Sequence, residues 1–230
     1  MLKVIDIVCG YGDLDIIKGI SFDVEDGQTK VLLSLNGSGK TTLLKSLSGI
    51  IPVRSGRIVF DGKDITNESP RERVRSGMLY VPEWGVFPTL TVRENLILAS
   101  SISKGKSNLD FSEISELFPD INGRLSERAA SLSGGQRKIL MLAMAVASGS
   151  KMLLLDEPSS GLSPSFVDRV LDILKQLKEE GITLLVAEQN PSFSEISDEL
   201  IILELGKIIS KGKYEDLRKN DEIRKKFFSL

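Results

Sequence analysis

The sequence contains no histidine and a single cysteine, Cys9, among its 230 residues. One cysteine cannot form a disulfide within the chain, and without histidine there is no Cys/His set for a zinc site. These absences exclude disulfide-stabilised folds and zinc modules. They are typical of a protein that works in a reducing cytoplasm.

The sequence also lacks a strong charge imbalance and a long apolar run. Its 30 basic and 32 acidic residues give a formal net charge of -2, so we expect no nucleic-acid partner, which would require a broad positive surface. The longest apolar run, residues 139–147, is far shorter than the ~20 residues that cross a bilayer. The N-terminus, MLKVIDIVCGYG, has no charged leader and no small-residue cleavage site, which favours a mature protein. We therefore expect no transmembrane segment and no secretion.

Short apolar segments alternate with helical patterns along the chain, which predicts an α/β fold. The strand-like segments are TKVLLSL, RIVF, MLYVP, KMLLLD and ITLLVAE. Residues 31–35 and 152–155 are nearly all apolar, as in parallel strands that are buried on both faces. Residues 85–155 are mostly helical in pattern, so we predict a helical subdomain inserted there, with limits uncertain by ~2–4 residues.

The segment SLNGSGKTT, residues 34–42, follows one of these strands and opens a helical pattern. The order strand, glycine loop, helix predicts a phosphate-binding loop. Gly37 and Gly39 allow backbone N–H groups to close around phosphate oxygens. Lys40 can reach the β and γ phosphates, and the Thr41 hydroxyl can ligate Mg2+.

Ser34 stands where such loops usually have their first glycine. It destabilises the loop by ~1–2 kcal/mol if the backbone there needs a positive φ, and is harmless otherwise. The alternative interpretation of this segment is a glycine-containing turn followed by a helix with a basic residue in its first turn.

The segment KMLLLDEPSSG ends an apolar strand with two adjacent carboxylates. Ligands of open parallel sheets bind at this edge. Asp156 can hold Mg2+ through water, while Glu157 can polarise the water that attacks the γ phosphate. The alternative for an isolated Asp-Glu pair is a solvated turn. The upstream phosphate loop instead favours roles in Mg2+ binding and hydrolysis.

The segment LSGGQRK, residues 132–138, is the most specific motif, expected by chance with a probability on the order of 1 in 1,000 or less. The phosphate loop, LSGGQ and LLLDEP, in this order, resemble the ATP-binding subunit of ABC transporters over essentially the whole chain. The resemblance implies one domain, residues 1–230. It also implies a P-loop NTPase core with a mostly parallel sheet, a small N-terminal antiparallel β subdomain and the inserted α-helical subdomain of residues 85–155.

The resemblance also implies the site residues. In this family the LSGGQ helix start serves the ATP of the opposite subunit, which fits the anion-binding character of a helix N-terminus. The aromatic residue of GYG is expected to stack on adenine. The implied nucleotide contacts are Tyr11, Asn36, Gly37, Ser38, Gly39, Lys40, Thr41, Thr42, Ser133, Gly134, Gly135 and Gln136; the implied ligands of Mg2+ are Thr41, Glu83 and Asp156; and the implied catalytic residues are Glu157, Gln189 and Lys40.

Glu83 and Gln189 depart from the usual family residues. Glu83 replaces a glutamine that senses Mg2+ and the attacking water, and a carboxylate is still a hard oxygen ligand. Gln189 replaces the switch histidine; its amide can donate a hydrogen bond to the γ phosphate but cannot transfer a proton. Glu157 must therefore orient the water without histidine. In SSGLSP, residues 159–164, Ser163 and Pro164 lie in the loop through which subunits communicate and also form a good helix start.

The segments VPE, EQN, FPTLTVRENL and DEPSSGLSP are together similar to the second ATPase subunit of branched-chain amino acid importers and of their amide or urea relatives. This similarity implies transmembrane permease subunits, a second ABC ATPase subunit that is identical or different, and a place on the inner face of the cell membrane. Trp84, Val86 and Phe87 lie near the expected docking groove, although each could instead pack internally.

Two other classes of ATPase are alternatives. A chromosome-maintenance ATPase needs a very long coiled coil between its phosphate loop and signature, and the segment between Lys40 and Leu132 is too short for one. A soluble ABC ATPase of iron–sulfur cluster assembly has a suitable size and stays open.

Overall fold

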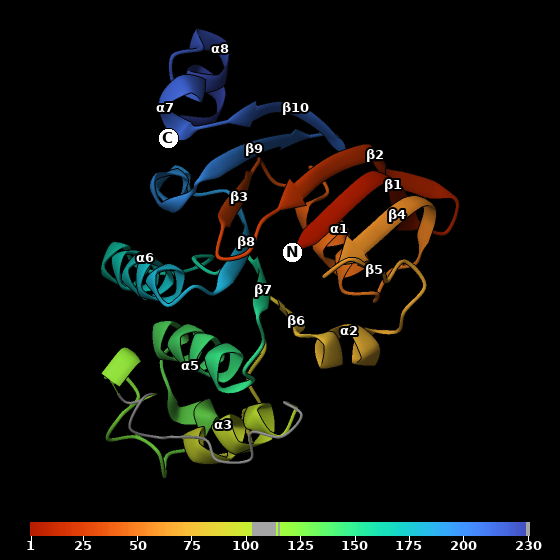
Figure 1. Ribbon diagram of the computed structural model, residues 1–230. Coiled ribbons are helices and arrows are strands. Elements are labelled where there is room, and N and C mark those ends of the chain that lie inside the picture. The colour runs from red at the N-terminus through yellow and green to blue at the C-terminus, as the bar shows by residue number, and fades with distance from the viewer. Residues whose placement is uncertain (103–113, 115, 229–230) are drawn as a thin grey trace.

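The computed structural model describes residues 1–102, 114 and 116–228, and its strands form two sheets (Figure 1). The smaller sheet is antiparallel, with the order β2-β1-β4-β5. Its strands are β1 (Leu2–Tyr11), β2 (Leu14–Val24), β4 (Val53–Phe60) and β5 (Lys63–Asp64). The predicted antiparallel N-terminal sheet is confirmed.

The larger sheet has the order β10-β9-β3-β8-β7-β6 and is parallel except for the β9–β10 hairpin. Its strands are β3 (Thr29–Leu33), β6 (Met78–Val81), β7 (Met152–Asp156), β8 (Thr183–Glu188), β9 (Glu199–Glu204) and β10 (Lys207–Gly212). Every residue of β3, β7 and β8 is buried, as the continuous apolar runs predict. The predicted α/β class with a mostly parallel sheet is therefore confirmed.

Helices lie on both faces of the parallel sheet, and further helices lie beyond one end of it. They are α1 (Lys40–Leu47), α2 (Pro70–Ser76), α3 (Val92–Ser100), α5 (Gly134–Ala147), α6 (Pro164–Glu179), α7 (Tyr214–Leu217) and α8 (Asp221–Ile223), with short 3-10 turns at Ala129–Ser131 and Pro191–Ile196 and a π-helical turn at Arg224–Phe228. Capping boxes start α2, α3 and α5, which satisfies backbone N–H groups that have no partner within the helix. As the Ser163-Pro164 pair predicts, α6 begins at Pro164, although the hydroxyl of Ser163 bonds that of Ser165 rather than a backbone N–H.

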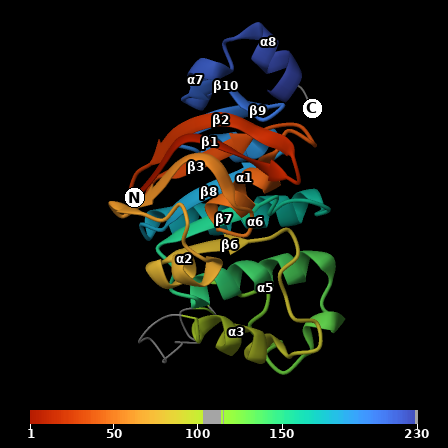
Figure 2. The ribbon, with the colours of Figure 1, turned by 90° about the vertical axis from the view of Figure 1, so that its right-hand side faces the viewer.

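Alternate residues of the central strands supply two separate cores. In β3, Leu32 packs with α1 and the antiparallel sheet, while Val31 and Leu33 pack on the other face with α5 and α6. The same alternation holds in β7 and β8, because successive side chains of a strand point to opposite faces. The parallel sheet thus separates the α1 side of the molecule from the α5 and α6 side (Figure 2).

Helices α3 and α5 pack together at the end of the molecule opposite α7 and α8 (Figures 1 and 2). They lie between β6 and β7 in the sequence. Strand β7 begins at Met152 and belongs to the parallel sheet, within the stated margin of the expected limit at 155, and the inserted helical subdomain stays a prediction. Residues 103–113 and 115 of this range lie outside the described residues. No helix in the described part of the chain combines the length and apolarity needed to cross a membrane.

Helix α1 is held at its C-terminal end by the buried side chain of Arg73 on α2. The guanidinium donates hydrogen bonds to the carbonyls of Ser46 (2.9 Å) and Leu47 (2.6 Å). A cation is favourable there because the carbonyl end of a helix carries partial negative charge. The helix that begins with the predicted phosphate loop is therefore fixed at the end far from that loop.

Candidate nucleotide-binding site

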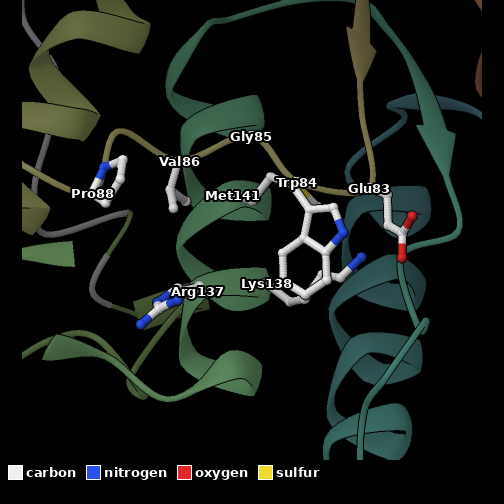
Figure 3. A pocket seen from close by; sticks show the side chains of 8 residues that line it. All are labelled: Glu83, Trp84, Gly85, Val86, Pro88, Arg137, Lys138 and Met141. Atoms are coloured by element: carbon white, nitrogen blue, oxygen red, sulfur yellow. The ribbon is translucent and has the colours of Figure 1, made fainter. Parts of the chain in front are cut away.

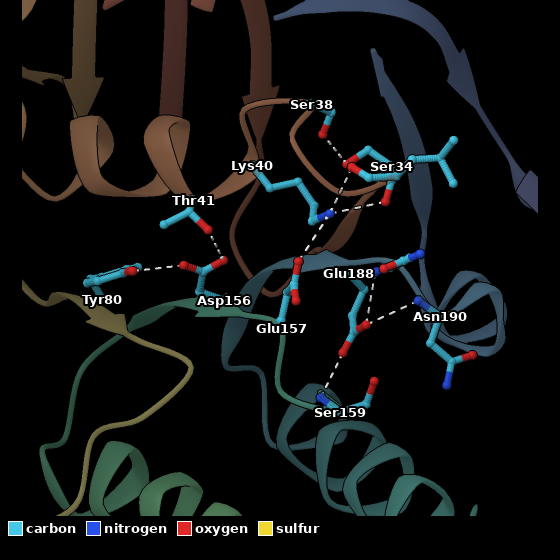
Figure 4. Close-up of polar contacts among 12 residues, drawn as sticks. Ser34, Ser38, Lys40, Thr41, Tyr80, Asp156, Glu157, Ser159, Glu188 and Asn190 are labelled. Carbon is cyan, nitrogen blue, oxygen red and sulfur yellow. Dashed lines mark hydrogen bonds and ion pairs between the residues drawn. The ribbon is translucent and has the colours of Figure 1, made fainter. Parts of the chain in front are cut away.

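The carboxyl ends of β3, β7 and β8 meet at one edge of the parallel sheet and bring the predicted motifs together (Figure 4). The phosphate loop follows β3, Asp156 and Glu157 stand at the end of β7, and Glu188 ends β8 with Gln189 after it. Segments far apart in the chain thus form one site, at the edge where open α/β sheets bind their ligands.

The phosphate loop contains two glycines in the left-handed backbone region. Gly37 and Gly39 have φ values of 76° and 106°, the left-handed region that glycine adopts without strain. Ser34 is not among the described residues with positive φ, so it brings no backbone strain. Its hydroxyl instead shares a 2.6 Å hydrogen bond with that of Ser38, which links the first and central parts of the loop.

The ammonium of Lys40 is buried inside this loop. Its Nζ donates hydrogen bonds to the carbonyls of Ser34 (3.1 Å) and Leu35 (3.3 Å) and lies 3.2 Å from a carboxylate oxygen of Glu157. The positive charge is therefore held between the carbonyls of the loop and the carboxylate of Glu157. A phosphate entering this position would meet a preformed cation.

Asp156 accepts two side-chain hydrogen bonds, from the Thr41 hydroxyl (3.0 Å) and from the Tyr80 hydroxyl (2.8 Å). Burial raises the pKa of the Asp156 carboxyl, and both hydrogen bonds oppose that rise. Burial is also the main cause that raises the pKa of Tyr80, so the phenol stays a donor. Tyr80 was not predicted as a site residue; its only signal was its place one residue before the end of the MLYV strand.

The oxygen atoms of Thr41 and Asp156 are suitable ligands for Mg2+, which prefers hard oxygen donors. Within the described residues, no group of three or more His, Cys, Asp or Glu residues could hold a metal by itself. This donor set fits a Mg2+ that is bound by one or two protein oxygens and completed by phosphates and water. It does not fit a resident metal cage.

Glu157 has an unusual backbone conformation for a non-glycine residue, with φ at 47°. Such a conformation costs of order 1–3 kcal/mol and persists only when neighbouring groups enforce it. Here the N–H of Glu157 donates to the Ala187 carbonyl (2.8 Å), and its own carbonyl accepts from the Lys138 ammonium (2.9 Å). Two elements, β8 and α5, thus hold the residue that aims its carboxylate at Lys40.

Glu188 is a buried carboxylate that sequence reasoning overlooked. It is 2% exposed and accepts hydrogen bonds from the N–H groups of Ser159 (2.8 Å), Gln189 (3.0 Å) and Asn190 (3.2 Å). Burial raises the pKa of Glu188 and these bonds oppose the rise. Glu188 joins the loop after Glu157 to the segment that carries Gln189, so these two loops are held together.

Gln189 and Glu157 line the same cavity, together with Ser159, Ser160 and Gly161. Gln189 is half-buried, at the open end of β8. Its position beside the carboxylate is compatible with the expected contact to a γ phosphate. That contact stays a prediction.

Glu83 lies in the loop after β6 and lines a different cavity, between this loop and α5 (Figure 3). Trp84, Arg137 and Lys138 line the same cavity, and the Lys138 ammonium lies 5.3 Å from the centre of the Trp84 ring. The expected role of Glu83 toward Mg2+ stays a prediction.

The LSGGQ segment starts α5 through a capping box. The Gln136 N–H donates to the Ser133 hydroxyl (3.2 Å), and the Ser133 N–H donates to the Gln136 side chain (3.0 Å). Ser133 and Gly134 are exposed, as a site for an external anion requires. Gly135 has another reason to be glycine, because an added Cβ would lie 2.6 Å from the Phe166 ring of α6.

Tyr11 ends β1 opposite Leu14, and its ring is 52% exposed. An exposed aromatic surface can stack on a base. The stacking itself stays a prediction.

Comparison with known proteins gives consistent results. Residues 17–160 match the family model described as ABC transporter. A probable branched-chain amino acid transport ATP-binding protein, LivF, of Archaeoglobus fulgidus is 33% identical over 98% of this chain and 97% of its own length. The high-affinity branched-chain amino acid transport ATP-binding protein BraG of Pseudomonas aeruginosa is 34% identical over 93% of both chains. A xylose/arabinose import ATP-binding protein of Sulfolobus acidocaldarius is 31% identical over 94% of this chain and 89% of its own length.

A solved structure gives the same result for the fold. An ATP-binding cassette of an ABC transporter, crystallised in its ADP conformation, superposes with a TM-score of 0.86 and is 25% identical, covering 100% of this chain and 99% of its own. Family model, relatives and fold agree with the nucleotide site at the sheet edge. This chain therefore belongs to the ABC transporter family, as one of its ATP-binding, ATP-hydrolysing subunits.

Proposed function

We propose that this chain is the ATP-hydrolysing motor of an importer for branched-chain amino acids or related small amides. The observation that carries this proposal is the similarity to two branched-chain amino acid transport subunits over almost their whole length. The sugar-import relative has a comparable identity. The proposed substrate class therefore also rests on two residues that differ from the usual residues of the family. These are Glu83 in VPE and Gln189 in EQN.

In the proposed mechanism, the phosphate loop binds the ATP phosphates through its backbone N–H groups and through Lys40. Thr41, Asp156 and Glu83 would hold Mg2+, which would neutralise phosphate charge, and Glu83 would also lie near the attacking water. Binding of the phosphates draws the Lys40 ammonium away from Glu157, which frees that carboxylate to orient the water. Gln189 donates a hydrogen bond to the γ phosphate, and Tyr11 stacks on adenine.

A second ABC ATPase subunit completes each site in this proposal. Ser133, Gly134 and Gln136 stand at the exposed start of α5, where they can meet the ATP of a facing subunit but not the phosphate loop of their own chain. The second subunit is either a copy of this chain or a different chain.

An apolar groove on the helical end of the molecule is the proposed docking place for a permease. It has a volume of about 350 Å³, runs between the end of β6, the loop after it, α3 and α5, and is lined by Val81, Phe87, Leu98, Ile102 and Met144 among others. Trp84 lies beside it with 64% of its surface exposed. An exposed apolar surface of this kind fits a partner protein, and a permease partner would place this chain on the inner face of the membrane.

The test is purification of the full chain from its source, with its interaction partners, followed by reconstitution into liposomes. The proposal expects a polytopic membrane protein in the complex and ATP hydrolysis that rises with leucine or a small amide plus the matching binding protein. Stimulation by xylose instead would contradict the substrate class. Recovery of iron–sulfur assembly proteins without a membrane protein would favour the soluble ATPase alternative.

A further inference from the structure

The buried lysine on α5, Lys138, is an element of the site that the nucleotide mechanism does not use. It lies in the first turns of the helix that LSGGQ begins, and it is 2% exposed. The residues that follow it on α5, from Ile139 to Ala143, are buried and apolar. An ammonium in this core needs a specific reason, because burying a charge without partners is unfavourable.

The surroundings of Lys138 provide that reason. Its Nζ donates to the Glu157 carbonyl (2.9 Å) and lies 5.3 Å from the centre of the Trp84 ring (Figure 3). Burial lowers the pKa of Lys138, while Glu83, Glu188, Glu157 and Asp156 act in the opposite direction. The ammonium is therefore near enough to these four carboxylates to be stabilised by their negative charge.

The contact with Glu157 matters because that residue is strained. Its φ of 47° is enforced from two sides, by Ala187 on β8 and by Lys138 on α5. The Glu157 carbonyl also accepts from the Ser160 N–H (3.1 Å), so losing the Lys138 contact would leave it held by its own turn but no longer by α5. The backbone that carries the Glu157 carboxylate would then be held less firmly, and the carboxylate, which lies 3.2 Å from Lys40 in this structure, would be less precisely placed to orient the water.

We propose that Lys138 is a positioning residue that fixes Glu157 from the signature helix, so that a movement of α5 is transmitted to the catalytic carboxylate of the same chain. The exposed start of α5 and the site of hydrolysis are then joined by one side chain. This inference goes beyond the proposed substrate and permease, and rests on the proposed role of Glu157 in ATP hydrolysis.

The first experiment replaces Lys138 by methionine, which keeps the apolar stem and removes the donor. We expect kcat for ATP to fall by about 10- to 100-fold, the range for a reacting group displaced by about 1 Å. The Kd for a fluorescent ATP analogue with Mg2+ should stay within about twofold, because the phosphate loop is intact. The melting temperature should be equal or higher, since replacing a buried ion with a well-packed apolar residue is often neutral or stabilising.

The matched control is Lys175→Met on α6, an exposed lysine that is far from the site and 3.7 Å from Asp172. It should change neither kcat nor Kd. Rates are measured on the full chain in the complex with which it copurifies, or alone if nothing copurifies. A Lys138→Met variant that hydrolyses ATP at the parental rate would overturn the proposal.

A double-mutant cycle with Ser133→Ala tests the transmission through α5. If Lys138 transmits the state of the helix start, the loss of kcat caused by Ser133→Ala should be smaller in the Lys138→Met background than in the parent. If Ser133→Ala lowers kcat by the same factor in both backgrounds, Lys138 does not transmit the state of the helix start. Lys138→Gln, which keeps an N–H donor, should have an intermediate rate; if neither Lys138 variant folds, the residue is structural and the proposal fails.

Discussion

The carboxyl edge of the parallel sheet and the surface beside α3 are built from different kinds of groups. At the sheet edge, Lys40, Asp156 and Glu188 are at most 4% exposed, and hydrogen bonds fix each charged group. Beside α3, the apolar residues Phe87 and Leu98 are 48% and 41% exposed. Hydrolysis needs fixed charges, whereas docking needs accessible apolar surface, so mutations should separate the two activities.

The largest effect is expected for Glu157→Gln at the sheet edge. Removal of a general base typically lowers kcat by about 10²- to 10⁴-fold, while the phosphate loop keeps its contacts. ATP should therefore stay bound and trap a dimer. Nucleotide titration and size-exclusion chromatography with light scattering measure the two properties, and turnover near the parental rate would contradict the role of Glu157.

Lys40→Ala is the matched contrast to this variant. It should weaken both nucleotide binding and turnover, because in the proposed mechanism the ammonium contacts the phosphates themselves. Equal binding by the two variants would mean that their roles are not separable.

The next effect in size is expected for Gln189→Ala. Loss of a hydrogen bond to a charged phosphate corresponds to ~1.5–3 kcal/mol, or roughly a 10- to 150-fold drop in kcat. Gln189→His should keep substantial activity, because imidazole can also donate to that oxygen. The rate at saturating MgATP is compared after melting temperatures have shown both variants to be folded. A folded alanine variant with the parental rate would reduce Gln189 to a residue that ends a strand.

A smaller effect is expected for Tyr80→Phe, which removes the 2.8 Å hydrogen bond to Asp156 and little else. Groups that orient a metal ligand typically contribute about 10-fold or more to metal affinity. The Mg2+ concentration for half-maximal ATP hydrolysis should rise by about 10-fold, with little change in rate at saturating Mg2+. Tyr214→Phe in the C-terminal helices is the control, and an identical Mg2+ dependence of the two variants would refute the role of Tyr80.

The smallest effect on hydrolysis is expected beside α3. Leu98 lines the apolar groove and is 41% exposed, so Leu98→Ser should change stability by only about 0.5 kcal/mol. Basal ATP hydrolysis should stay within about twofold, while copurification of the membrane protein should fall. Ile50→Ser, another exposed apolar position outside the groove, should leave both unchanged. Retention of the membrane protein by Leu98→Ser would place the docking surface elsewhere.

The parts of the site that could be predicted from the sequence are those with local signals. The apolar runs of residues 31–35 and 152–155 predicted the central strands, and the order strand, glycine loop, helix predicted where the loop follows β3. The backbone at Ser34 could not be predicted, since its φ depends on how the strand leads into the loop.

Tyr80, Lys138 and Glu188 were missed for a common reason. Each acts on a residue brought near by the fold, such as Asp156 for Tyr80 or Glu157 for Lys138. A single sequence contains no signal for such pairs. Gly135 was interpreted as a site for close approach of a ligand, and the nearby Phe166 ring shows that helix packing also requires it.

The alternation of β3 side chains between two cores has a consequence for unfolding. Leu32 stabilises the α1 side, whereas Val31 and Leu33 stabilise the α5 and α6 side. Neither core can melt while β3 stays in place, because the same strand supplies both. Heating should therefore give one calorimetric transition whose van't Hoff and calorimetric enthalpies agree, and truncation of Leu32 alone should lower the melting temperature of the α5 side as much as that of the α1 side.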